Sequence, residues 1–270
     1  MLWLFRIFQP IMKHAFYIFL ILSYAGFCQE PIATSLINKT NLKAETFVGI
    51  DNFGTIFYIN NNVFNKKQAN KSLTYSNVQL GKITYANTFN PLKINLFYKN
   101  FNTVVILDNR LGEIFKIDFN SIQPYKNVSQ ITTGFDNTLW IFNQDTQQLE
   151  LFDYKAKKTR AKTLPVKSNV LHIASNYNYC WLLTKTYLYK YNYFGSLIFK
   201  TANNGFSELA EHNENIILKK DNKLFYLKKN TKTLTPIKTP NLLIKQFFVT
   251  GETLYIYANE TLQEFQLKIN

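Results

Sequence analysis

Few residues in this sequence have the chemistry of a catalytic base or nucleophile. The 270-residue chain contains three histidines and two cysteines, of which His172, His212 and Cys180 lie beyond residue 28. A catalytic site needs several such groups to converge, with a base within reach of the group that it activates. His172 lies in the apolar segment VLHIAS and His212 in the polar segment AEHNEN. We therefore expect a packed or surface His172, a solvated His212 in a turn, and no catalytic role for either.

The spacings typical of metal and phosphate sites are absent from the sequence. It has no His-x-x-x-His, Cys-x-x-Cys or His-Glu-x-x-His pattern for zinc. It has no Gly-x-Ser-x-Gly elbow, and nine glycines are too few for a recurring phosphate-binding loop. The sequence therefore predicts no catalytic, cofactor-binding or metal-binding residues, and no cofactor.

Carboxylates are the other candidate catalytic groups, because glycoside hydrolysis needs two of them about 5–9 Å apart. Asp51 in GIDNFG and Asp136 in GFDNTL occupy equivalent positions, each before an asparagine, which is typical of turns. We interpret both as turn residues, and calcium binding there lacks a ligand-rich loop. Further carboxylates near turns are Asp108, Glu113, Asp118 and Asp145.

Aromatic residues are abundant, with 24 Phe and 17 Tyr. Trp140 and Trp181 fall in matching apolar segments, where core packing is expected. Cys180 stands where matching segments have Leu or Ile, so we expect a buried structural thiol. One segment is so crowded with aromatic residues that some must be exposed, and such a rim would suit contact with a protein or glycan. Its members are Tyr177, Tyr179, Tyr191, Tyr193 and Phe194.

The chain is basic, with a formal net charge of +14. A basic protein invites a nucleic-acid or anionic-membrane interpretation. The lysines are scattered along the chain, however, and Arg110 and Arg160 are the only arginines beyond residue 28. Arginine is the preferred reader of phosphates and bases. We therefore expect no nucleic-acid partner, and leave peripheral membrane association open.

The N-terminus resembles an export signal. Lys13 and His14 precede an apolar segment, 15–27, which is too short to span a bilayer. We expect residues 1–28 to be a signal peptide, with Met12 as an alternative start, and residues 29–270 to be one domain. An uncleaved membrane anchor is one alternative, and a lipoprotein modified at Cys28 is another. The predicted location is the periplasm or the outer membrane.

The elements that must position these residues form a repeat. Six apolar strand-like segments recur about forty residues apart, and a second strand follows each after a polar turn. The second strand begins eight residues after a fixed anchor position in five units and ten residues after it in the third. The anchors are Ile56, Leu96, Leu139, Cys180, Ile216 and Leu254.

Further strand candidates flank each of these hairpins. Four short antiparallel strands every forty residues are the signature of a β-propeller blade. The sixth unit lacks a fourth strand, and the segment IATSLIN, 32–38, can supply it. The sequence therefore predicts an all-β fold: a six-bladed propeller of four-stranded antiparallel blades, closed by its N-terminal strand, with seven blades as the alternative.

The segment VVILDNRLGEIFKIDF, 104–119, resembles the strand–turn–strand of PQQ, NHL or YVTN propeller repeats. The composition is basic and rich in Asn, Lys, Phe and Tyr, and it follows a predicted signal peptide. In these features the sequence is similar to uncharacterised exported propellers of Bacteroidota. The resemblance implies the fold and no particular activity.

The missing catalytic constellation favours a non-catalytic binding or scaffold protein of the bacterial envelope, a monomer that contacts another envelope protein. A carbohydrate-active or lactonase-like hydrolase with its site at the central channel is one alternative. An outer-membrane assembly factor is the other. Carboxylates that converge at one channel mouth would favour the hydrolase.

Overall fold

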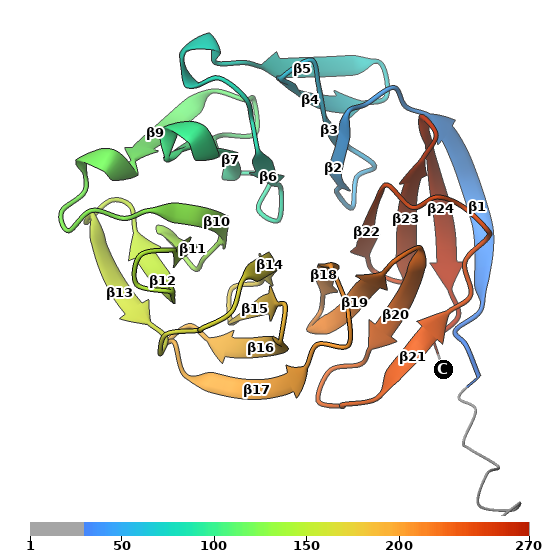
Figure 1. Ribbon diagram of the computed structural model, residues 1–270. Coiled ribbons are helices and arrows are strands. Elements are labelled where there is room, and N and C mark those ends of the chain that lie inside the picture. Colours follow the sequence, from blue (N-terminus) through green and yellow to red (C-terminus); the bar gives the residue numbers. More distant parts are fainter. Residues whose placement is uncertain (1–29, 270) are drawn as a thin grey trace, which may run out of the picture. The chain divides into compact units, whose positions relative to one another are not determined.

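The computed structural model describes residues 30–269. From Ile32 onward they form a closed ring of six four-stranded antiparallel sheets (Figure 1). This is the predicted six-bladed propeller, and the seven-bladed alternative is wrong. The predicted signal peptide, the start at Met12 and the lipidation of Cys28 lie outside the described residues. Within the described range no helix is both long and apolar enough to cross a membrane.

The first strand of each blade lines the centre of the ring (Figure 1). The second strand pairs antiparallel with the first. The two form a hairpin because two strand segments with alternating apolar residues are joined by a short polar turn. Each predicted hairpin is present. The innermost strands are β2 (Thr46–Ile50), β6 (Tyr85–Asn87), β10 (Val128–Thr133), β14 (Val170–Ser175), β18 (Glu208–His212) and β22 (Gln246–Thr250). The second strands are β3 (Ile56–Asn60), β7 (Ile94–Tyr98), β11 (Thr138–Asn143), β15 (Tyr179–Thr184), β19 (Asn215–Lys220) and β23 (Thr253–Ala258).

The third strand is mostly buried in every blade except the first, and the fourth strand forms the outer rim. The third strands are β4 (Val63–Gln68), β8 (Thr103–Leu107), β12 (Gln148–Asp153), β16 (Tyr187–Asn192), β20 (Lys223–Leu227) and β24 (Thr261–Leu267). The outer strands are β5 (Lys71–Tyr75), β9 (Glu113–Asp118), β13 (Lys158–Lys162), β17 (Leu197–Ala202), β21 (Leu234–Ile237) and β1 (Thr34–Asn41). Residues 30–269 also include three short 3₁₀ helices, η1 (Val78–Leu80), η2 (Lys99–Phe101) and η3 (Phe119–Ser121).

The N-terminal strand closes the ring. β1 pairs antiparallel with β24, from Thr34 opposite Leu267 to Asn41 opposite Thr261 (Figure 1). The predicted strand at 32–38 is shifted toward the C-terminus, because Ile32 forms a parallel bridge with Ile237 of the neighbouring blade. The N-terminal segment therefore contacts both the fifth blade and the sixth.

Hydrophobic clusters between neighbouring blades hold the ring together. The described residues form six such clusters, one for each pair of adjacent blades. Trp140 and Trp181 lie in two of them, both buried, as predicted. Cys180 is a free, buried thiol in the cluster between the third and fourth blades. Burial raises its pKa well above the usual range. The thiol therefore serves as a small apolar side chain.

One ion pair is buried between the second and third blades. Lys126 Nζ lies 2.6 Å from Glu150 Oε2, and the two side chains are 7% and 5% exposed. Glu150 also accepts hydrogen bonds from Asn143 Nδ2 at 3.0 Å and from the Thr159 hydroxyl. Burial opposes ionisation, but Lys126 and these donors together keep the pKa of Glu150 below its usual value.

Candidate functional site

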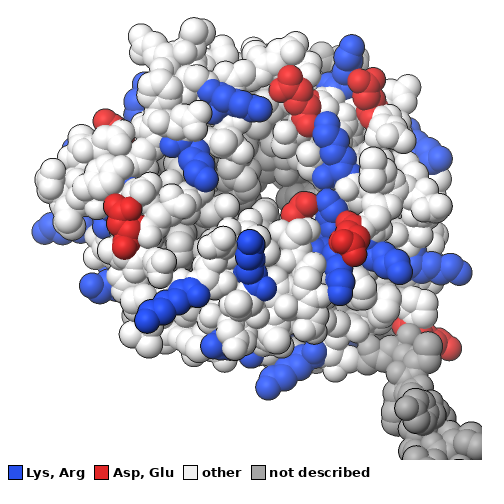
Figure 2. Space-filling model, viewed as in Figure 1, with Lys and Arg blue, Asp and Glu red and all other residues white. Residues whose placement is uncertain are grey.

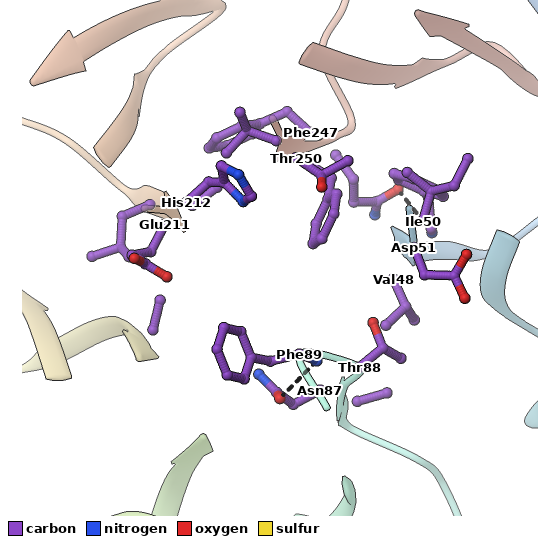
Figure 3. Close-up of a pocket in the computed structure, with 18 of the residues that line it drawn as sticks. Val48, Ile50, Asp51, Asn87, Thr88, Phe89, Glu211, His212, Phe247 and Thr250 are labelled. Carbon is purple, nitrogen blue, oxygen red and sulfur yellow. Dashed lines mark hydrogen bonds between the residues drawn. The ribbon is translucent and has the colours of Figure 1, made fainter. Parts of the chain in front are cut away.

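A cavity of about 520 Å³ opens at the centre of the ring, a volume within the range of small-ligand sites. Figure 3 shows its walls arranged around an open centre. The innermost strands β2, β6, β14, β18 and β22 supply them. Because these strands run in the same direction along the channel, their following turns meet at one mouth.

Side-chain turns fix the geometry at that mouth. Asp51 Oδ1 accepts the backbone N–H of Phe53 at 2.9 Å, and Asn87 Oδ1 accepts that of Phe89 at 3.3 Å. Asn176 Oδ1 accepts the N–H groups of Asn178 and Tyr179, both at 2.9 Å. Asp and Asn favour such turns because their short side chains satisfy the backbone two residues ahead. The residues that follow each of these side chains are thereby held in a fixed turn.

Aromatic rings from three successive turns gather there. Phe89 and Tyr177 lie with ring centroids 5.0 Å apart, and Phe135 and Tyr177 with centroids 6.2 Å apart, both edge to face. Phe89 and Tyr177 are each 40% exposed and Phe135 is 58% exposed. The ring of Phe89 points into the opening (Figure 3). We refer to Phe89, Phe135 and Tyr177 as the aromatic mouth.

The fifth blade supplies a carboxylate. Glu211 Oε1 accepts hydrogen bonds from Asn176 Nδ2 at 2.9 Å and from the Glu214 N–H at 2.8 Å. Burial raises the pKa of the Glu211 carboxyl above its usual range, against the effect of those two donors. Oε2 has no hydrogen-bond partner within residues 30–269, and Glu211 lines the cavity.

Both histidines line the cavity. His212 Nε2 accepts the N–H of Gly251, in the sixth blade, at 2.8 Å, and burial lowers the pKa of His212. His212 is therefore partly exposed at the end of β18 rather than in a turn, and its ring bridges two blades. His172 is packed, as expected, and lies edge to face against Tyr85 of the second blade with centroids 6.4 Å apart. Burial also lowers the pKa of His172, so both imidazoles are neutral at pH 7.

The other carboxylates of the cavity do not converge with Glu211. Glu208 Oε1 lies 2.7 Å from Lys219 Nζ. Asp51 lies across the opening from Glu211 and His212 (Figure 3). A carboxylate pair for hydrolysis must flank one bond, and this arrangement does not provide it.

The charge of the cavity contrasts with that of the chain. Its described lining residues include three carboxylates and no Lys or Arg. The lysines and arginines on the visible face are spread around the ring rather than gathered in one patch, with a hollow at the centre (Figure 2). Within residues 30–269, no group of three or more His, Cys, Asp or Glu could hold a metal ion.

On the side of the third blade, hydroxyl and amide groups tie the innermost strands together. Thr133 Oγ1 donates to Asn87 Oδ1 at 2.6 Å, and Thr132 Oγ1 lies 2.9 Å from Ser175 Oγ. Asn95 Nδ2 donates to Thr133 Oγ1 at 2.9 Å. These bonds join the second, third and fourth blades and make that wall of the channel rigid.

The remaining predicted turn carboxylates have structural roles. Asp108 Oδ1 accepts the N–H groups of Arg110 and Gly112, both at 2.8 Å. Asp118 Oδ1 caps η3 through the Asn120 N–H at 2.9 Å. Three more have contacts of other kinds: Glu113 with the Tyr75 hydroxyl, Asp145 with Asn127 Nδ2, and Asp136, whose carbonyl accepts from Lys93 Nζ.

The crowded aromatic segment of the fourth blade is divided by the fold. Tyr177 belongs to the aromatic mouth, whereas Tyr191 is buried. Tyr179 stacks under the ammonium of Lys190, whose Nζ lies 3.8 Å from the ring centroid. Tyr193 and Phe194 are exposed on the β16–β17 turn and pack on each other, with centroids 4.1 Å apart. The predicted rim is therefore split between two turns.

Phe89, Phe135 and Glu211 are not among the residues that we predicted from the sequence. A signal for the two phenylalanines exists, because they and Tyr177 all occupy the first turn of successive repeats. Glu211 has no such signal, since its role depends on contact with Asn176 of the preceding blade.

No model of a known protein family matches the sequence, and no curated protein matches it significantly. Among solved structures, virginiamycin B lyase from Staphylococcus aureus is 12% identical, with a TM-score of 0.60 over 87% of this chain and 99% of that one. The Pan2 WD40 domain of Neurospora crassa is 7% identical, with a TM-score of 0.58 over 84% of this chain and 76% of that one.

PorZ, a bacterial surface component of the type-IX secretion system of Porphyromonas gingivalis, is 13% identical. It has a TM-score of 0.53 over 84% of this chain and 32% of its own. At these identities the likeness concerns the fold alone. The chain therefore has the β-propeller fold.

Proposed function

We propose that this chain is an exported, non-catalytic binding module of the bacterial envelope, which holds another protein at its aromatic mouth. The observation that carries the proposal is the contrast between the two kinds of residue at the cavity. The titratable groups of the cavity are dispersed and mostly engaged by the protein's own groups. In contrast, three exposed aromatic rings from separate blades cluster at its mouth, and one of them, Phe89, also lines the cavity. Clustered aromatic residues are the usual anchors of protein interfaces.

The location in the envelope rests on the sequence. The basic and apolar segments at residues 13–27 are typical of a secretory signal, and the composition is similar to that of exported propellers of Bacteroidota. Cys180 is the single cysteine beyond residue 28, so the exported chain would have no second thiol with which Cys180 could form a disulfide. A chain of this kind suits an oxidising compartment. The outer-membrane assembly factor is a narrower form of this proposal.

Site-specific photo-crosslinking in the native host tests the proposal. We expect p-benzoylphenylalanine at Phe135 to give a reproducible adduct with an envelope protein, because that ring is the most exposed of the aromatic mouth. The matched control carries the same probe at Ile114 on outer strand β9, which is 49% exposed, and should give none.

Adducts at Ile114 but not at Phe135 would contradict the proposal and assign the contact to the outer rim. A pure protein that hydrolyses an oligosaccharide or lactone, and loses that activity in Glu211→Gln, would favour the hydrolase instead.

A further inference from the structure

The electrostatics of the cavity differ from those of the molecule around it. The chain has 31 Lys and Arg against 17 Asp and Glu. The described lining residues reverse this balance, with Asp51, Glu208 and Glu211 and no basic side chain. Of the three carboxylates, Glu208 is neutralised by Lys219 at 2.7 Å. Asp51 and Glu211 form no ion pair within residues 30–269, although the charge of Lys190 acts on Glu211 from a distance. An anionic guest would therefore be repelled by these two carboxylates, whereas a cationic guest would compensate them.

Glu211 offers the means to bind such a guest. Its Oε1 is held by Asn176 and by the Glu214 N–H, which fixes the carboxylate. Burial raises the pKa of Glu211 and the nearby charge of Lys190 acts against this rise, but Lys190 forms its ion pair with Glu214 and not with Glu211. Its carboxylate lines a partly desolvated cavity, where an ionic hydrogen bond is stronger than in water. Aromatic faces such as those of the mouth attract cations as well.

The protein holds one of its own lysines in this way. Lys190 Nζ lies 2.7 Å from Glu214 Oε2 and 3.8 Å from the ring centroid of Tyr179. Its side chain is nearly buried, so a carboxylate and an aromatic ring suffice to accommodate an ammonium group in this fold.

From this contrast we infer that the cavity accepts a cationic side chain, a lysine ammonium or arginine guanidinium, which a partner protein inserts between Glu211 Oε2 and the aromatic mouth. The inference rests on the proposed function and names the chemistry of its partner. Glu211 is the binding residue, and Asn176 positions it.

Binding of fluorescein-labelled hexalysine, measured by fluorescence anisotropy at pH 7.5 and low salt, tests the inference. The net positive charge of the chain repels this probe, so saturable binding reports a local site. We expect Glu211→Gln to weaken binding about tenfold, the value of one charge-assisted hydrogen bond. Glutamine keeps an acceptor for Asn176, and burial already raises the pKa of Glu211, so this variant should melt no lower than the parent.

The matched control is Glu45→Gln, which removes the same charge from an exposed residue outside the cavity and should change affinity less than about twofold. Hexalysine acetylated on every side chain should not bind. Failure of hexalysine to bind, equal binding of the acetylated peptide, or equal weakening by both variants would overturn the inference. So would tighter binding of neutral chitotriose that Glu211→Gln leaves unchanged.

The two proposals fail separately. A Phe135 adduct with an envelope protein, combined with no hexalysine binding, overturns the cationic guest and leaves the binding module standing. Hexalysine binding that depends on Glu211, without any adduct at Phe135, supports the site and contradicts the protein partner.

Discussion

A chain that begins at Leu42 instead of Ile32 should fail to form a stable ring. The truncation removes β1, which pairs with β24 over the full length Thr34–Asn41. It also removes the Ile32 backbone bonds to Pro236 at 2.8 Å and Lys238 at 2.9 Å. A net gain of about 1 kcal/mol per hydrogen bond makes this loss comparable to the whole stability of a domain, about 5–15 kcal/mol.

The truncation also leaves β24 as an open edge. Such an edge promotes association between chains. We therefore expect loss of the cooperative thermal transition, followed by circular dichroism, and aggregates in size-exclusion chromatography. A synthetic peptide of residues 32–41 added in trans should restore the transition, whereas a scrambled peptide should not. A truncated protein that melts within about 2 °C of the parent would show that the pairing of β1 with β24 adds little stability.

The second large effect is expected at the buried ion pair. Lys126→Met should lower the free energy of unfolding by about 3–5 kcal/mol, because it leaves the Glu150 carboxylate buried and unpaired. Glu150→Gln in the Lys126→Met background should recover a large part of this loss. The second change removes the charge and keeps an acceptor for Asn143 Nδ2. Urea denaturation at pH 7 measures all three proteins.

The effect of Lys126→Met should depend on pH. The folded-state pKa of Glu150 is lowered, so the pair contributes fully above the ordinary glutamate pKa and is lost as the pH falls through the folded value. The difference between parent and variant should therefore shrink below about pH 4.5. A difference that is equally large in acid would mean that lost packing, not the unpaired charge, causes the effect.

The repeat made the fold predictable from the sequence. The predicted segment at 253–257 is strand Thr253–Ala258, because alternation and polar turns are local signals. Closure by the N-terminus was also predictable, since the sixth unit lacked a fourth strand. The shift of the first strand was not, because the bridge from Ile32 to Ile237 joins residues from different blades.

The contacts that shape the cavity could not be predicted from the sequence, because they too join residues from different blades. Glu211 meets Asn176 of the fourth blade, and His212 meets Gly251 of the sixth. Each partner is set by the twist and packing of neighbouring blades rather than by local pattern. The turn positions of Asp51 and Asp136 were predicted correctly, because turn chemistry is carried by adjacent residues.

Hydrogen–deuterium exchange of the protein, with and without the partner recovered through Phe135, tests most directly whether the channel mouth is the binding surface. We predict that protection on binding is concentrated in the turns at 51–54, 87–91, 134–137, 176–178 and 211–214. Protection confined to the outer strands β5, β9, β13 and β17, with these turns unchanged, would contradict the account.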